Sequence, residues 1–196
     1  LPLSLDTLRF AFAHDTTPAR QALDLPLDRP VLLTVRRLVA RMGLEILIDA
    51  MTAVTQRHQG TLLLIGGKGY LRPRLLEPIH TGGLKDNVRL LGLIPEEQLP
   101  AYYQAADLFI LPSLALEGFG LVSIESLSCG TPVIATPVGA NPEVVGSLGH
   151  AFLSRTPTVA DLAERITHWL DRGVSPELRR QCRQYCVSRF AAQTVA

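Results

Sequence analysis

The sequence has little charge of either sign in excess and no long apolar run. Its 19 Lys and Arg residues nearly balance 18 Asp and Glu residues, for a formal net charge of +1 over 196 residues. No overall field therefore favours nucleic acid or an anionic membrane as a partner. No apolar stretch is long enough to span a bilayer, and no signal-peptide pattern occurs. We expect no transmembrane segment, while peripheral membrane contact of a larger protein stays open.

Cysteine is scarce, with three residues whose spacing fits neither a disulfide framework nor a metal site. They are Cys129, Cys182 and Cys186. We expect a reduced, cytoplasmic chain that holds no metal. The first residue is Leu rather than Met, and we expect the chain to be a piece of a longer protein.

Several signatures of other enzyme classes are also missing. No GxGxxG fingerprint follows the first apolar run, which argues against a dinucleotide oxidoreductase. No Ser-His-Asp or Cys-His order indicates a nucleophile, and the five histidines form no ligand pattern. Lys68 and Lys85 are the two lysines, and neither lies in a context typical of a pyridoxal phosphate site, which argues against a phosphorylase.

Short apolar runs alternate with helical patterns along the chain. Because parallel strands covered on both faces have this signature, we predict an α/β fold. Right-handed crossovers would make it a doubly wound, mostly parallel, Rossmann-like sheet of about six strands with helices on both faces. The expected strands lie in 30–37, 61–67, 88–94, 107–113, 132–139 and, more briefly, 151–155. The expected helices lie in 18–23, 43–56, 72–81, 96–106, 119–128, 141–145, 159–172 and 176–189, with Asn141 as an N-cap and Pro142 behind it.

Ligands of such sheets bind at the carboxyl ends of the strands, and four loops there carry candidate residues. Arg36, Arg37 and Arg41 follow the first expected strand, and their planar guanidinium groups suit phosphate oxygens. A glycine-rich turn at 66–69 follows the second strand, where a tight turn is favoured over phosphate contact. Gly92 follows the third strand and fits either a base-stacking backbone or a plain turn.

The loop after the fourth expected strand carries two acids, Glu117 and Glu125, around Gly118-Phe119-Gly120. Two carboxylates are compatible with general acid and base chemistry, as in glycoside hydrolysis. They equally suit the binding of sugar or ribose hydroxyls, since ionised carboxylates accept hydrogen bonds. The helix that follows offers free backbone N–H groups to a phosphate.

These segments occur in a recognisable order: RRLVARMG, LIGGKG, VRLLGLIP, ADLFILPS, EGFGLVSIE and CGTPVIATPVGANPEVV. The set resembles the C-terminal, donor-binding domain of family 4 GT-B retaining glycosyltransferases over nearly the whole chain. The resemblance implies three parts: an inter-domain segment at 1–28, a nucleotide-sugar-binding domain at 29–172 and a C-terminal helix at 173–196. It further implies that the N-terminal acceptor domain is absent, so that this chain alone should transfer little.

The resemblance also implies a role for each matching residue. Arg37 matches the arginine that binds the donor diphosphate, and Glu117 matches the acid that faces the transferred sugar, which makes both candidate catalytic residues. Glu125 matches the acid that binds the ribose hydroxyls, and Ile94 falls at the base contacts. The backbone that would hold sugar hydroxyls and phosphate belongs to Gly118, Phe119, Gly120, Leu121 and Val122. Members of the family use a nucleoside diphosphate sugar, keep the anomeric configuration and need neither a catalytic metal nor another cofactor.

The chain departs from the family pattern at two places. Met42 stands where a lysine usually precedes the glycine of the first loop, and a lost contact to phosphate would cost about 1.5–3 kcal/mol if nothing replaced it. We expect Arg41 to share the diphosphate with Arg37, and Arg36 to be the second substitute. Met42 also keeps open a non-catalytic nucleotide- or sugar-binding module of the same fold. Gly139-Ala140 replaces a frequent Gly-Gly, and Ala140 should be tolerated unless its backbone needs a positive φ.

Overall fold

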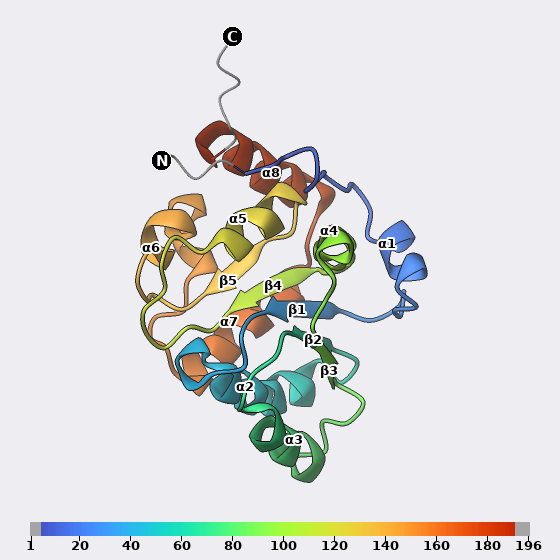
Figure 1. Ribbon diagram of the computed structural model, residues 1–196, viewed down its shortest axis with the longest axis vertical. Helices are drawn as coiled ribbons and strands as arrows, with labels where there is room; N and C mark the ends of the chain where they lie inside the picture. Colours follow the sequence, from blue (N-terminus) through green and yellow to red (C-terminus); the bar gives the residue numbers. More distant parts are fainter. Residues whose placement is uncertain (1–4, 191–196) are drawn as a thin grey trace.

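A parallel five-stranded sheet forms the centre of the molecule in the computed structural model, which describes residues 5–190 (Figure 1). The strand order is β3-β2-β1-β4-β5. Every pairing is parallel, and β1 lies between β2 and β4 and pairs with both. The strands are β1 (Val31–Val35), β2 (Leu62–Gly66), β3 (Val88–Gly92), β4 (Leu108–Leu111) and β5 (Val133–Ala135).

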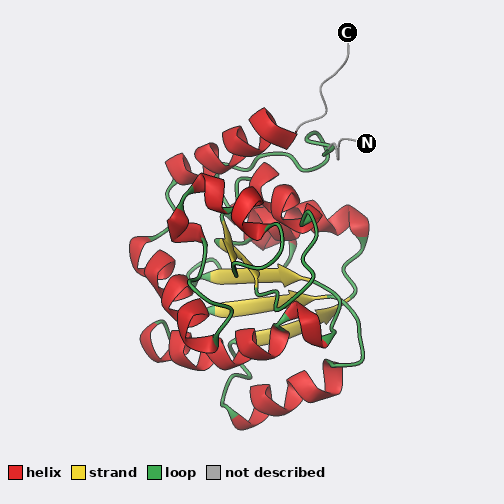
Figure 2. Ribbon diagram, turned by 90° about the vertical axis from the view of Figure 1, so that its left-hand side faces the viewer, coloured by secondary structure: helices red, strands yellow, loops and turns green. Residues whose placement is uncertain are grey.

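Helices cover both faces of this sheet, which explains why most strand residues are apolar (Figure 2). On one face α2 packs against α3 and α7, and on the other α5 packs against α4 and α8. The helices are α1 (Thr17–Ala22), α2 (Leu44–Arg57), α3 (Arg72–Thr81), α4 (Leu99–Ala105), α5 (Leu121–Ser128), α6 (Asn141–Val144), α7 (Val159–Arg172) and α8 (Pro176–Phe190), with short 3-10 turns η1 (Ala40–Met42), η2 (Glu96–Gln98), η3 (Gly146–Leu148) and η4 (His150–Phe152). The predicted doubly wound α/β fold is therefore confirmed.

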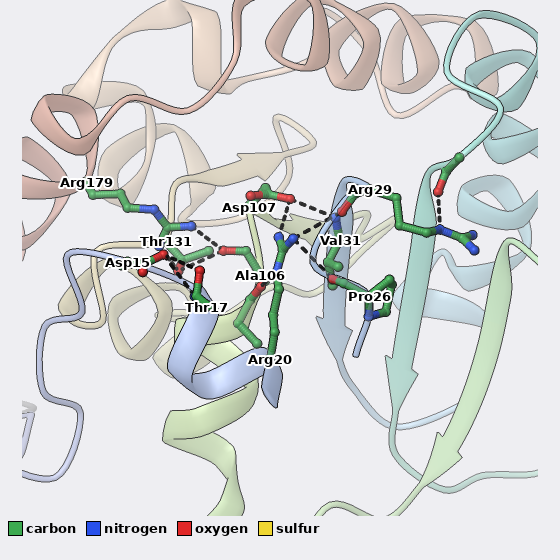
Figure 3. Close-up of polar contacts among 12 residues, drawn as sticks. Asp15, Thr17, Arg20, Pro26, Arg29, Val31, Ala106, Asp107, Thr131 and Arg179 are labelled. Carbon is green, nitrogen blue, oxygen red and sulfur yellow. Dashed lines mark hydrogen bonds and ion pairs between the residues drawn. The ribbon is translucent and has the colours of Figure 1, made fainter. Parts of the chain in front are cut away.

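The amino edge of the sheet is closed by buried arginines (Figure 3). Arg20 from α1 forms an ion pair of 2.7 Å with Asp107, and the same carboxylate accepts the backbone N–H of Val31 at the start of β1. Arg179 from α8 donates to the carbonyl of Ala106 at 2.6 Å. These bonds join α1 and α8 to the starts of the strands, so side chains at the amino edge stabilise the packing of these helices.

The sixth strand predicted at 151–155 is wrong as a strand. A single parallel bridge joins Ala135 to Leu153, and the residues before it form the 3-10 turns η3 and η4. Gly149 between the two turns has φ 147, and the tight turns leave too little extended chain for a ladder. The segment still borders β5, although it adds no named strand.

Asn141 is not the N-cap of α6, as the sequence predicted, because Ala140 holds that position. The side-chain amide of Asn141 instead donates to the carbonyl of Thr136 at 2.9 Å and is buried. Pro142 lies in the first turn, as expected. Residues 1–4 of the predicted inter-domain segment and 191–196 of the predicted C-terminal part lie outside the described residues.

Candidate functional site

The loops after β1 and β4 meet at the carboxyl edge of the sheet around an open pocket of about 480 Å³. This volume lies in the range of small-molecule sites. Two arginines and one glutamate supply its charged side chains, which leaves one positive charge in excess. The pocket is lined by Val35, Arg36, Arg37, Met42, Glu117, Gly118, Phe119, Gly120, Leu121 and Val122.

Glu117 is held by a buried cation and a buried hydroxyl. Arg36 Nη2 lies 2.5 Å from Glu117 Oε2, and the two side chains are 5% and 8% exposed. Arg36 Nη1 donates to Ser113 Oγ at 3.0 Å, and the Ser113 hydroxyl donates to the same Oε2. The carboxylate is thus fixed through one oxygen and compensated in charge.

The amino end of α5 opens onto the same pocket. Gly120 is its N-cap, with φ 68, and a glycine has no side chain with which to cap the helix. The amides of Leu121 and Val122 donate to no backbone acceptor within the described chain, since the first internal bond there runs from Ser123 to Gly120. The Ser123 hydroxyl is also buried and has no hydrogen-bond partner among residues 5–190. Free N–H groups at a helix start favour an anion.

Glu125 lies deeper on α5 and does not line the pocket. Its Oε2 accepts a hydrogen bond of 2.8 Å from the hydroxyl of Tyr103, a fully buried residue of α4. Burial raises the pKa of the Glu125 carboxyl, against the opposing effects of the Tyr103 hydroxyl and the positive charge of Arg9. A carboxyl kept partly desolvated in this way is a candidate for a functional group.

The structure places the other predicted residues less directly. Arg41 donates from Nη1 to the carbonyl of Leu116 at 3.0 Å and accepts, through its own carbonyl, the amide of Leu114. It therefore braces the acidic loop. Ile94 is buried, and its side chain packs where a Cβ on Gly66 would lie. The roles of Arg41 toward a diphosphate and of Ile94 toward a base stay predictions.

The glycine-rich turn at 66–69 supports the site from behind. A Cβ on Gly67 would overlap the carbonyl of Arg36, and one on Gly69 would overlap that of Leu38. Arg36 N donates to Gly66 O at 2.8 Å, and Leu38 N donates to Lys68 O at 2.9 Å. The glycines therefore allow close approach of two loops, which agrees with the tight-turn interpretation.

The sequence missed two partners of the acids, Ser113 and Tyr103. The Ser113–Glu117 contact joins two residues of one loop that lie four positions apart, whereas the Tyr103–Glu125 contact joins α4 to α5 across 22 positions. The position of Ser113 at the end of a strand was the available signal for it. Tyr103 carried no such signal, because an aromatic residue in an amphipathic helix usually packs in the core.

Two absences concern the part of the chain that the structure describes. Residues 5–190 contain no group of three or more His, Cys, Asp or Glu side chains that could hold a metal ion. Within the same range, no helix is long and apolar enough to cross a membrane. The expectation that no metal takes part stays a prediction.

Comparison with known proteins places this chain in one family. The family model "Glycosyl transferases group 1" matches residues 15–188. The chain therefore belongs to the group 1 glycosyl transferases, as its resemblance to their C-terminal domain implied.

Curated relatives include two mycobacterial enzymes described as GDP-mannose-dependent alpha-(1-6)-phosphatidylinositol monomannoside mannosyltransferase. The one from Mycolicibacterium smegmatis is 37% identical over 152 residues, covering 74% of this chain and 40% of the relative. The one from Mycobacterium tuberculosis (strain CDC 1551 / Oshkosh) is 34% identical over 176 residues, covering 86% of this chain and 46% of the relative. The chain thus spans less than half the length of either.

Solved structures agree on the fold. A sucrose-phosphate synthase from Thermosynechococcus elongatus is 32% identical with a TM-score of 0.83, covering 97% of this chain and 48% of that one. The HepE protein of Anabaena, solved with UDP and glucose, is 26% identical with a TM-score of 0.82, covering 96% of this chain and 51% of that one. The Rossmann-like architecture is shared along almost the whole chain.

Proposed function

We propose that this domain binds a nucleoside diphosphate sugar and forms the donor-binding half of a configuration-retaining glycosyltransferase. An N-terminal domain outside this chain would hold the acceptor. The observation that carries the proposal is the pocket at the carboxyl edge of the sheet, where two arginines and the open start of α5 face one acid. Such a surface suits a ligand that is anionic at one end and hydroxylated at the other.

The residues divide naturally between these two ends of the ligand. Arg37 and the free amides of Leu121 and Val122 would hold the diphosphate, because cations and helix amino ends attract anions. Glu117 would accept hydrogen bonds from hydroxyls of the sugar. Arg37 and the two amides would also stabilise the negative charge that develops on the departing diphosphate. No step in this scheme needs a metal.

Glu125 and Ile94 would hold the nucleoside. The Glu125 carboxylate would accept the ribose hydroxyls with the oxygen that Tyr103 leaves free, and the backbone around Ile94 would lie against the base. The complexes of HepE with UDP and the GDP-mannose dependence of the mycobacterial relatives support a nucleotide sugar as the ligand. The base and the sugar are to be identified by experiment, and a cytoplasmic location stays a prediction.

A binding panel tests the proposal. Thermal shifts of the chain would be measured with UDP, GDP and ADP and with their glucose or mannose derivatives. A ligand at 100 times its Kd stabilises the native state by about 2.7 kcal/mol, so one nucleotide series should raise the melting temperature clearly. Failure of every compound at millimolar concentration would contradict the proposal.

Arg37→Ala provides the residue-level test. Loss of a charge-assisted contact worth about 1.5–3 kcal/mol should weaken nucleotide binding roughly 10- to 150-fold. Arg180→Ala is the matched control, because Arg180 lies on α8 and, among residues 5–190, pairs only with exposed Glu177. If a longer protein with both domains binds the nucleotide sugar but transfers nothing, the chain is a non-catalytic binding module of this fold instead.

A further inference from the structure

Arg36 pairs with the acid Glu117 and lines the same pocket. Its side chain is only 5% exposed, yet it lines the pocket together with Arg37. Its backbone is fixed as well, because Arg36 N donates to Gly66 O and the glycine-rich turn packs on its carbonyl. A rigid guanidinium is therefore presented to any ligand.

The hydrogen bonds of Arg36 use only part of its capacity. A guanidinium carries five N–H donors, and the structure pairs one on Nη1 with Ser113 and one on Nη2 with Glu117. The remaining three have no acceptor among residues 5–190.

Glu117 is likewise engaged on one side. Its Oε2 accepts both the Arg36 and the Ser113 donors. Its Oε1 has no donor among the described residues and lies 3.8 Å from the point where a Cβ would stand on Gly120, beside the pocket. Arg36 and Glu117 thus each keep a free side.

Resting on the donor-binding function proposed above, we propose that Arg36 is a positioning residue that couples the two halves of the donor. The N–H groups of Arg36 that bind Ser113 and Glu117 hold the Glu117 carboxylate so that its free oxygen faces the sugar. Its unused N–H groups contact the diphosphate together with Arg37. A planar fork can serve both at once, whereas a lysine ammonium is a point charge that cannot hold the same geometry.

Arg36 fits this role better than Arg41. The Arg41 guanidinium is committed to the carbonyl of Leu116 and does not line the pocket. Met42, which does line it, brings a thioether without charge. The cations that face the pocket are therefore Arg36 and Arg37.

The test compares the dissociation constants of a bare nucleoside diphosphate and of the matching nucleotide sugar, using the pair that the binding panel selects. The ratio of the two dissociation constants reports how much the sugar adds to affinity. A substitution that only destabilised the fold would weaken both ligands alike and leave this ratio unchanged. We expect Arg36→Lys to bind the bare diphosphate within about threefold of the original chain, because the charge remains, and to lose the affinity that the sugar adds. We expect Arg36→Met to weaken the bare diphosphate about tenfold or more as well.

Two further variants remove the ambiguity of an unpaired buried acid. Arg36→Met combined with Glu117→Gln leaves no uncompensated charge, so it should fold and still bind the diphosphate weakly. Arg36→Met combined with Met42→Lys returns a cation to the pocket, and it should recover the diphosphate affinity without the sugar increment. Circular dichroism and melting curves confirm that each variant is folded.

The outcomes distinguish failure of the proposed function from failure of the inference about Arg36. If the original chain binds none of the nucleotides, the proposed function fails and this inference fails with it. If the original chain binds, and Arg36→Met changes neither the bare diphosphate affinity nor the ratio, Arg36 only packs beneath the site and the inference alone is wrong.

Discussion

Glu117 and Glu125 lie on one loop–helix segment but have different surroundings. Glu117 is compensated by the Arg36 guanidinium at 2.5 Å. Glu125 meets a neutral hydroxyl, that of Tyr103, and burial raises its pKa. The two carboxylates, eight positions apart, therefore differ in charge compensation, which allows them different roles.

The first prediction concerns this division of labour. Glu125→Ala should weaken binding of the bare nucleotide, because the ribose hydroxyls lose their acceptor. Glu117→Ala should chiefly remove the additional affinity contributed by the sugar, as titrations with nucleotide and nucleotide sugar would measure. Equal losses of bare-nucleotide affinity in both variants would contradict it.

The second prediction concerns pH and stability. Since the folded pKa of Glu125 lies above its ordinary value of 4.5, the folded chain binds this proton more tightly than the unfolded chain. The contribution of Glu125 to stability is therefore fully present below pH 4.5 and declines as the pH rises through the folded pKa.

Glu125→Gln removes this loss, because the amide stays neutral and still accepts from Tyr103. The melting temperature of the variant minus that of the original chain should increase from pH 4 to pH 7. Nucleotide binding should weaken in the variant. Glu77→Gln, at an exposed position of α3, is the control and should show no such trend. If the difference in melting temperature between Glu125→Gln and the original chain stayed constant with pH, the raised pKa of Glu125 would be contradicted.

At the scale of elements, the loop after β5 limits where the acidic loop can lie. Gly139 has φ 59, and a Cβ there would overlap the carbonyl of Glu117. Ala140 has φ −81 and ψ −1, which any residue adopts. The tolerance of alanine at 140, expected from the sequence, therefore has a structural basis, and the conformational demand falls on Gly139 alone.

The third prediction follows from this contact. Gly139→Ala should lower the free energy of unfolding by about 1–3 kcal/mol and reduce affinity for the nucleotide sugar, because it displaces the backbone of Glu117. Ala140→Gly, its neighbour, should cost less than about 1 kcal/mol. Urea unfolding and binding titrations measure both, and similar losses in the two variants would refute the assignment.

Across the whole molecule, the two edges of the sheet carry different groups. The carboxyl edge carries the pocket, and the amino edge carries the buried arginines that join α1 and α8 to the strands (Figure 3). Stability and binding should therefore respond to different substitutions.

The fourth prediction tests this separation with Asp107→Ala. It leaves Arg20 buried without its anion and Val31 N without an acceptor, so the free energy of unfolding should fall by on the order of 3 kcal/mol. Asp171→Ala breaks a more exposed pair with Arg57 and should cost less than about 1 kcal/mol. Nucleotide affinity of the folded chain should not change in either variant, and a large loss of affinity in Asp107→Ala would show that the edges are coupled.

The sequence predicted the elements well, because apolar periodicity and glycine or proline boundaries are local signals. The helix expected at 72–81 has the bounds of α3, and five of six expected strands form. The sixth fails because η3 and η4 use the chain that a ladder would need. Asn141 misled for a related reason: its amide found an acceptor at Thr136 across the turn, which a local capping rule does not foresee.

The site divides along the same line. Arg37, Glu117 and Glu125 could be assigned to the carboxyl ends of strands from the sequence, because each apolar run shows where its strand ends. The folded chain was needed to show that Arg36 pairs with Glu117, that Arg41 donates to the carbonyl of Leu116, and that Tyr103 donates to Glu125. These choices depend on which side chains the packed loops bring within a few ångströms, and a linear pattern does not contain those distances.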